Sequence, residues 1–286
     1  MITNQQKDKI LAVMAENRKN YVSDAKHAAS LGLSVSVYSN IKNGDTERKL
    51  SDAGWVSLAR RLDVSIEDGK QWQVVKTPVF EYVTTQLALC RQQGLSGIIC
   101  DLPDIGKTVA AKWFARNTPN TVYVDCSQVK TRPRLIRHIA RLFGVTSTGR
   151  YVDVYDDLVS YLRSLDHPMI ILDEAGDLTY EAYLELKALW NATEHYCGWY
   201  QLGADALRTK IDRGIEYAKV GYAELKSRFG NVYQRITPVD AKELEAFIAT
   251  QATMVAKANA GEGVNIKEVV GKCGGSLRRV YTALNK

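Results

Sequence analysis

The spacing of apolar residues divides the chain into a helical beginning, a middle in which strands alternate with helices, and a helical end. In the first part, apolar residues at helical spacing predict helices over 5–17, within 23–34, within 34–44 and around 55–62. Ser23 is a suitable capping residue for the second helix, and Asn43-Gly44 is a suitable stop for the third. We expect these helices to share a small core of their own.

The middle part contains short, continuous apolar runs, which are typical of strands buried on both faces of a sheet. The predicted strands cover 97–100, 121–125, 169–173, 199–203 and 233–237. Helical patterns lie between them. This alternation predicts an α/β fold in which helices cover both faces of a parallel sheet.

The end of the chain is helical, with predicted helices over 241–258, 266–273 and 276–285. Around residues 69–78 the chain contains glycine, lysine and proline and has the composition of a linker. The predicted division is a helical domain at 1–70, a linker at 71–78, an α/β core at 79–238 and a helical lid at 239–286.

Composition narrows the function only slightly. A chain of 286 residues favours two or three domains, and a net charge of +6 suits a nucleic-acid partner without requiring one. The chain has no apolar run long enough for a bilayer and no signal-peptide pattern, so we expect a soluble, intracellular protein without a membrane partner. The five cysteines are scattered and lack C-x-x-C spacing, which predicts buried free thiols.

The most informative motif is the stretch 100–108, with the sequence CDLPDIGKT, which we call the P-loop. It follows a predicted strand and precedes a predicted helix, the context that a phosphate-binding loop requires. In such loops the lysine, here Lys107, reaches the β- and γ-phosphates, and the threonine, here Thr108, binds Mg²⁺. The candidate nucleotide-binding residues here are Asp104, Ile105, Gly106, Lys107 and Thr108 of this stretch and Val109, which follows it.

A second motif supports the first. The run MIILDE at 169–174 is a buried-strand pattern that ends in two acids, as the Walker B motif does. Asp173 would hold Mg²⁺, directly or through water, and Glu174 would orient or deprotonate the attacking water. The alternative for these acids is a solvated strand end. With both motifs in the expected order, the sequence predicts that the chain binds ATP and Mg²⁺.

The P-loop departs from its consensus at two positions. Asp101 stands where the first glycine of G-x-x-x-x-G-K-[ST] belongs, and Asp104 stands at a position often held by glycine. Aspartate tolerates a left-handed backbone, but two carboxylates beside a triphosphate are electrostatically unfavourable. We therefore expect weaker nucleotide binding or slower hydrolysis than in a standard loop. The alternative is a protein that binds nucleotide without hydrolysing it.

These motifs, followed by a helical tail, resemble an AAA+ ATPase core with its lid. By this resemblance Arg228, in the segment LKSRF, is the arginine finger that enters a neighbouring subunit's site, and Arg278, in GSLRRV, is the sensor-2 arginine that contacts nucleotide. The alternatives are a surface salt bridge for Arg228 and an acidic-surface or phosphate contact for Arg278. The sensor-1 position is occupied by Ala204 instead of a polar residue, and Gln201 or Asp205 are the candidate substitutes.

The amino-terminal helices resemble the helix-turn-helix of the lambda-repressor/Cro class. The resemblance rests on Gly32 at the turn, the Asn43-Gly44 stop and the helix that contains Leu58 and Leu62. The polar face of the third helix would then read a major groove, which makes its outward side chains candidate DNA contacts. These side chains are Ser36, Ser39, Asn40 and Lys42. The alternative is a helical protein-interaction module without DNA contact.

The order of the parts resembles the B transposition proteins of Mu-like phages and transposons. This resemblance implies a protein in the cytoplasm of a bacterial host that binds double-stranded DNA with little sequence preference in its ATP state. It also implies self-association into a filament or ring, delivery of target DNA to a DDE-type transposase, and hydrolysis that releases the assembly.

Two loops of the core carry candidate DNA contacts. One follows the second strand and opens the next helix, where lysine, arginine and helix N–H groups suit phosphates. The other precedes the following helix. The candidate residues are Lys130, Thr131, Arg132 and Arg134 in the first region and Thr148 and Arg150 in the second. The alternative is a solvated basic surface.

Two other functions fit the same motifs. One is a sequence-specific transcriptional regulator in which ATP controls oligomerisation. The other is an ATPase that loads a replicative helicase, which would bind single strands.

Overall fold

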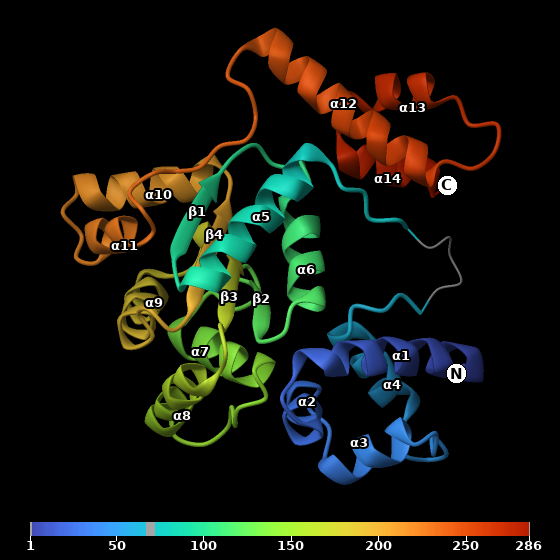
Figure 1. Cartoon of the computed structure of the whole chain (residues 1–286), viewed down its shortest axis with the longest axis vertical. Helices are drawn as coiled ribbons and strands as arrows, with labels where there is room; N and C mark the ends of the chain where they lie inside the picture. Colours follow the sequence, from blue (N-terminus) through green and yellow to red (C-terminus); the bar gives the residue numbers. More distant parts are fainter. Residues whose placement is uncertain (1, 67–71, 286) are drawn as a thin grey trace.

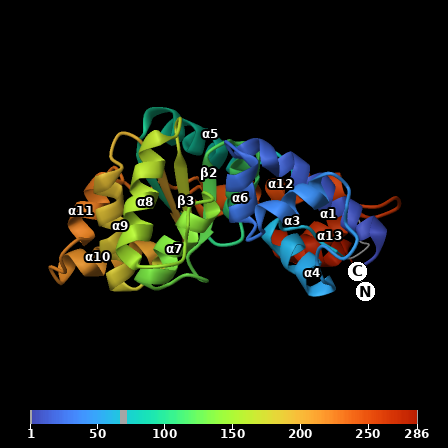
Figure 2. The same cartoon turned by 90° about the horizontal axis from the view of Figure 1, so that it is seen from below.

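The computed structural model describes residues 2–66 and 72–285. It consists of an amino-terminal helical unit, a central sheet with helices on both faces, and a group of carboxy-terminal helices (Figure 1). Figure 2 shows the same arrangement from below, with the amino-terminal unit and the carboxy-terminal helices on the same side of the sheet. The fold is α/β, as predicted.

The amino-terminal helices begin at hydroxyl side chains that cap them. Thr3, Ser23, Ser34 and Ser51 each accept a hydrogen bond from a backbone N–H of the first turn. The elements are α1 (Asn4–Asn17), the 3-10 turn η1 (Arg18–Asn20), α2 (Asp24–Ser30), α3 (Val35–Lys42) and α4 (Asp52–Arg61). Between α2 and α3 the backbone of Gly32 has φ of +62°, which favours glycine. These helices enclose their own cluster of apolar side chains, which includes Trp55 and Ile41.

The central sheet has four parallel strands in the order β1-β4-β3-β2. Their bounds are β1 (Ser96–Cys100), β2 (Thr121–Asp125), β3 (Met169–Asp173) and β4 (Gly198–Gly203). Alternate residues of one strand enter different clusters, since Ile171 faces one layer of helices and Ile170 the other. Burial on both faces explains why these strands are continuous apolar runs.

Helices cover both faces of this sheet. One layer contains α5 (Pro78–Gln93) and α6 (Lys107–Asn117). The other layer contains α7 (Arg132–Leu142), α8 (Tyr151–Ser164), α9 (Tyr180–Ala192), α10 (Asp205–Glu216) and α11 (Tyr222–Arg228), with the 3-10 turn η2 (Ala175–Asp177) after β3. Because all four strands are parallel, their carboxyl ends lie at the same end of the sheet, where α6 follows β1.

The predicted fifth strand at 233–237 is wrong. This segment makes only one bridge to the sheet, between Gln234 and Ile99. Beyond it, the backbone N–H groups of Ile236 and Thr237 donate to the carboxylate of Asp101 at 2.6 and 2.9 Å. A side chain thus takes the donors that a strand would give to its neighbour, and the ladder stops.

The carboxy-terminal helices form a separate small cluster, for which we keep the name lid. They are α12 (Ala241–Asn259), α13 (Ile266–Cys273) and α14 (Leu277–Leu284). The predicted linker contributes to this cluster through Trp72 and Val75. Of that linker, residue 71 lies outside the described residues, and Pro78 is the first residue of α5. The four-part division of the chain stays a prediction.

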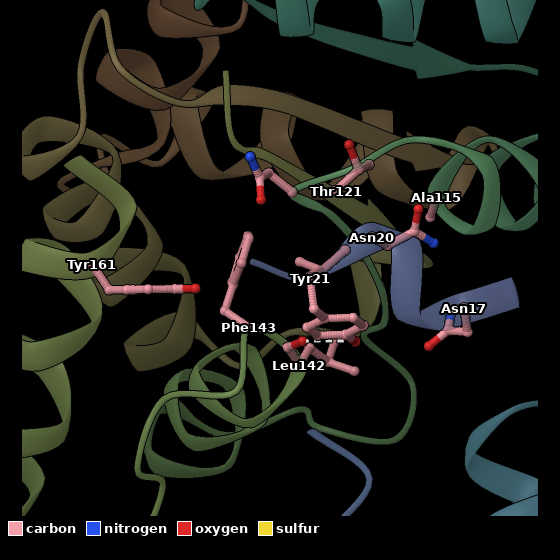
Figure 3. A pocket seen from close by; sticks show the side chains of 10 residues that line it. Asn17, Asn20, Tyr21, Ala115, Thr121, Leu142, Phe143 and Tyr161 are labelled. Carbon is pink, nitrogen blue, oxygen red and sulfur yellow. Dashed lines mark hydrogen bonds between the residues drawn. The ribbon is translucent and has the colours of Figure 1, made fainter. Parts of the chain in front are cut away.

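The amino-terminal unit lies against the core near the start of β2. The hydroxyl of Tyr21 donates to the carbonyl of Leu142 at 3.1 Å, and the ammonium of Lys26 lies 4.2 Å from the ring centre of Tyr161. Between the two parts is a cavity of about 40 Å³, which Figure 3 shows with Tyr21 and Phe143 on its wall. All five cysteines are buried and free, as predicted. Among the described residues, no helix combines the length and the apolar content that crossing a lipid bilayer requires.

Candidate functional site

A cavity of about 610 Å³ lies where the P-loop, the ends of the strands and the lid meet. Seven of the candidate nucleotide-binding residues line it, together with Glu174. These seven are Asp104, Gly106, Lys107, Thr108, Val109, Asp173 and Arg278. Ile105 does not border it, because its side chain is buried in the core beneath the loop. Residues that are far apart in the sequence therefore share one hollow.

The P-loop has the backbone that phosphate binding requires. Gly106 caps α6 with φ of +99°, and Asp104 has φ of +61°, so both residues turn the chain through the left-handed region. The helix α6 then points its free N–H groups into the cavity. The Lys107 ammonium donates to the carbonyls of Asp101 and Leu102, at 2.9 and 2.6 Å. Burial lowers the pKa of Lys107, although nearby carboxylates oppose this shift.

The Walker B acid is held by hydroxyl groups. Asp173 is buried, and its Oδ2 accepts hydrogen bonds from the hydroxyls of Thr108 at 2.7 Å and Tyr123 at 2.8 Å. A hydroxyl beside a carboxylate is the hard-oxygen set that Mg²⁺ takes from proteins when it also binds phosphates and water. These residues therefore fit the cation. Tyr123, on β2, was not expected from the sequence, because it is simply an aromatic residue within an apolar strand.

Glu174 follows directly and faces the same cavity. Its backbone has φ of +50°, and its N–H donates to Oδ1 of Asp173 at 3.0 Å. Partial desolvation and the negative charge of Asp173 raise the pKa of Glu174 above its usual value. A carboxylate with a raised pKa beside a phosphate-binding loop suits a residue that positions or deprotonates water.

The two acids that depart from the P-loop consensus both accept hydrogen bonds from the lid or from the segment that leads into it. The side chain of Asp101 has no exposed surface, and it accepts hydrogen bonds from the backbone and hydroxyl of Thr237. Burial opposes ionisation of this carboxyl, but the hydrogen bonds outweigh it and lower the pKa of Asp101. Asp101 does not border the cavity. Asp104 does, and it binds Ser276 and Arg278 at the start of α14.

Part of the wall of the cavity is aromatic and apolar. Trp72 and Tyr281 lie there with ring centres 4.7 Å apart in an edge-to-face arrangement. Phe80 and Val75 also line the cavity. Nothing in the local sequence marks these residues, because Trp72 lies in the predicted linker and Tyr281 is one apolar position of a lid helix. Only the packing of the lid against residues 72–77 brings them together.

The sensor-1 position offers no polar group to the cavity. Gly203 and Ala204 form the wall there. Gln201 is buried and accepts a hydrogen bond from the hydroxyl of Tyr183 at 3.1 Å. Asp205 is the first residue of α10 and lines a different, open depression on that helix. Neither candidate substitute therefore borders the cavity.

Arg228 lies away from the cavity, at the end of α11. Its guanidinium lies 5.2 Å from the ring centre of Trp190, and its Nε donates to the side chain of Asn191 at 2.8 Å. Both contacts are on α9. The role of an arginine finger in a neighbouring subunit stays a prediction.

The basic candidates of the core gather around the starts of α7 and α8. Lys130 pairs with Asp177 at 2.9 Å, and Arg150 pairs with Asp153 at 2.8 Å. Arg132 lies 3.4 Å from a carboxylate oxygen of Glu185 and over the ring of Tyr151. Thr131, Arg134 and Thr148 are exposed. These acids partly neutralise the surface, so a phosphate would have to compete with them.

The candidates on α3 lie on the amino-terminal unit. Ser36, Ser39 and Lys42 are exposed and Asn40 is half-buried. The ammonium of Lys42 binds Asp24 at 2.6 Å, and that contact joins α3 to α2. The other three share one exposed face of a short helix. DNA binding by this face stays a prediction.

The fold and the cavity together define the class of the protein, a P-loop ATPase core with a helical lid. Residues 90–202 match the family described as AAA domain. The chain is also 28% identical over 160 residues to the Mu-like prophage FluMu DNA transposition protein B of Haemophilus influenzae. That match covers 54% of this chain and 52% of the relative, so the chain spans about half of the length of the relative.

The chain also has a weak similarity to a solved structure. NtrX from Brucella abortus, crystallised in complex with ATP, has a TM-score of 0.45 and 12% identity to this chain. The match covers 88% of this chain and 58% of that protein.

Proposed function

We propose that the protein is a Mg²⁺-dependent ATPase of DNA transposition, in which ATP controls assembly on DNA. The observation that carries the nucleotide part is the shared cavity of Lys107, Thr108, Asp173 and Glu174. The relative named as a DNA transposition protein supports the biological setting.

In this proposal Lys107 and the N–H groups at the start of α6 bind the β- and γ-phosphates. Thr108 and Asp173 would hold the cation, which would neutralise phosphate charge when it is bound. Glu174 positions water, and its raised pKa makes it a better proton acceptor near neutral pH than an ordinary carboxylate. The apolar wall at Sensor 1 removes one polar contact to the phosphates, so we expect slow hydrolysis that acts as a timer.

The assembled form is the finer part of the proposal. Bound ATP links neighbouring subunits through Arg228, and the assembly coats double-stranded DNA as a filament or ring. Lys130, Thr131, Arg132, Arg134, Thr148, Arg150 and the polar face of α3 contact the duplex. The coated DNA is then the target that a DDE-type transposase receives.

The test uses the full chain and its Lys107→Ala variant on random-sequence duplex DNA, with ATP, ADP or no nucleotide. Negative-stain electron microscopy should show coated DNA when the unaltered chain is mixed with ATP. It should show no coated DNA with ADP, without nucleotide, or with the Lys107→Ala variant. Lys257→Ala is the matched control, because Lys257 is an exposed lysine on the lid helix α12. It should bind nucleotide and DNA normally.

DNA binding that is indifferent to both ATP and Lys107 would refute the ATP-controlled assembly. Protection of a single palindromic site would favour the transcriptional regulator, and preference for single strands would favour the helicase loader. Radiolabelled ATP hydrolysis measured on the same samples tests the enzymatic part separately.

A further inference from the structure

Asp104 connects the P-loop to the lid. Its carboxylate accepts a hydrogen bond from the hydroxyl of Ser276 and another from the backbone N–H of Arg278, at 3.1 Å. Ser276 is also the capping residue of α14, since its Oγ accepts from the N–H of Arg279 at 3.2 Å. The carboxylate therefore lies at the start of a helix, where an anion is favourable.

The guanidinium of Arg278 adds little to this contact. Its Nε lies 3.8 Å from Asp104, and the arginine side chain is 86% exposed, whereas that of Asp104 is 25% exposed. An exposed ion pair of this kind contributes little stability. The directional bonds from Ser276 and from the backbone hold Asp104, and they leave the guanidinium free to turn toward the cavity.

Asp101, the other acid that departs from the P-loop consensus, makes a different kind of contact. Asp101 is fully buried and holds Ile236 and Thr237, just before the lid begins. The lid is thus attached to the P-loop at two points. One is buried and does not border the cavity, and the other, Asp104, borders it beside Lys107 and Arg278.

We propose that Asp104 competes with the terminal phosphate for the start of α14, and that its charge sets the preference of the site between ATP and ADP. This inference rests on the proposed nucleotide binding. A triphosphate in the cavity brings its charge close to the Asp104 carboxylate, and the two anions repel each other. ATP carries one more negative charge than ADP, so the repulsion disfavours ATP more. Asp104 is therefore a positioning residue for the lid. ATP must displace its carboxylate from the start of α14 in order to bind.

The test compares Asp104→Asn with the unaltered chain in titrations with ATP and ADP, read by displacement of a fluorescent nucleotide. Asparagine keeps an oxygen that accepts from the Arg278 N–H, and its amide NH2 can donate to the Ser276 hydroxyl. It also tolerates the positive φ of this position, but it has no charge. We expect ATP to bind about fivefold more tightly and ADP about twofold more tightly. Asp104→Gly, which also fits this backbone, should shift the ATP-to-ADP ratio in the same direction.

Asp240→Asn is the matched control. Asp240 is also an aspartate that caps a lid helix, α12, but it does not border the cavity. This variant should leave the ATP-to-ADP ratio unchanged. Melting temperatures of all variants establish that they are folded.

Two results would overturn the inference while the proposed function stands. One is an unchanged ATP-to-ADP ratio in both Asp104 variants, and the other is weaker ATP binding by Asp104→Asn, which would make Asp104 an ordinary helix cap. An unaltered chain that binds neither nucleotide would instead refute the proposed function itself.

Discussion

The carboxylate of Asp101 accepts hydrogen bonds from both the backbone N–H and the hydroxyl of Thr237. These bonds join the first position of the P-loop consensus to the segment that leads into the lid. The side chain of Asp101 does not border the nucleotide cavity and has no exposed surface. The expectation that this acid weakens nucleotide binding by facing the phosphates therefore does not match its position. Its role in this fold is structural.

Replacing Asp101 by glycine, the consensus residue of the loop, should destabilise the protein. The change leaves the N–H groups of Leu102, Ile236 and Thr237 without their acceptor. We expect a loss of about 2–3 kcal/mol in the free energy of unfolding, measured by urea denaturation, because buried donors lose their partner. Thr237→Val removes only the hydroxyl and should cost about 1 kcal/mol.

The same contact predicts a pH dependence. The hydrogen bonds lower the pKa of Asp101 in the folded protein, so its stabilisation is present above the pKa of the unfolded carboxyl, about 3.9, and is lost as the pH falls through the folded value. The difference in stability between the unaltered chain and Asp101→Asn should shrink in acid. A difference that stays constant down to pH 3 would show that the charge of Asp101 is not involved.

The sequence predicted the strands that are buried on both faces of the sheet. Continuous apolar runs followed by charged residues predicted β2 and β3 with the observed bounds and β1 and β4 to within one residue. The same reasoning failed at 233–237, because the competing acceptor is the side chain of Asp101, far away in the sequence. No local pattern reveals such a partner.

The residues of the candidate site also fall into a group that the sequence predicted and a group that it did not. Motif positions such as Lys107 and Asp173 are fixed by their place at the ends of strands, and the structure brings them to one cavity. Tyr123, Trp72 and Tyr281 were not predicted, because each borders the site or its ligands only through packing between distant segments. Apolar and aromatic residues carry no local signal that separates a binding wall from a core.

Tyr123→Phe should weaken the response to Mg²⁺. The hydroxyl of Tyr123 holds Oδ2 of Asp173, and loss of such an outer partner frees the acid to turn. We expect the Mg²⁺ concentration that half-saturates ATP binding to rise by about tenfold. The measurement is a titration of nucleotide binding with Mg²⁺, which does not depend on hydrolysis. Tyr155→Phe on α8 removes a hydroxyl elsewhere in the core and should leave the Mg²⁺ titration unchanged.

Trp72→Ala and Tyr281→Ala should weaken ATP binding by removing an aromatic wall. Stacking of a base on an aromatic side chain is worth about 1–3 kcal/mol, so we expect roughly a tenfold increase in Kd for ATP. Inorganic tripolyphosphate has no base, and its affinity should stay the same in both variants. Equal losses for ATP and tripolyphosphate would mean that the two aromatic residues only support the fold of the lid.

Acid should destabilise the amino-terminal unit through His27. This histidine is fully buried, with Nδ1 2.8 Å from the hydroxyl of Tyr38 and Nε2 3.0 Å from the side chain of Asn17. Burial, and then the positive charge of Arg18, lower the pKa of His27 to about 4 from the ordinary value of 6.5. The unfolded chain therefore takes up a proton below pH 6.5, whereas the folded chain does so only near pH 4.

Stability should fall over that interval by up to about 3 kcal/mol, since each unit of pKa difference corresponds to about 1.4 kcal/mol. Urea denaturation of the unaltered chain and of His27→Gln between pH 7 and pH 4 measures the effect. The two stabilities should converge as the pH falls, because glutamine has no proton to take up. Parallel curves, or an NMR titration of the His27 ring with a midpoint near 6.5, would show that the buried imidazole is not kept neutral by the fold.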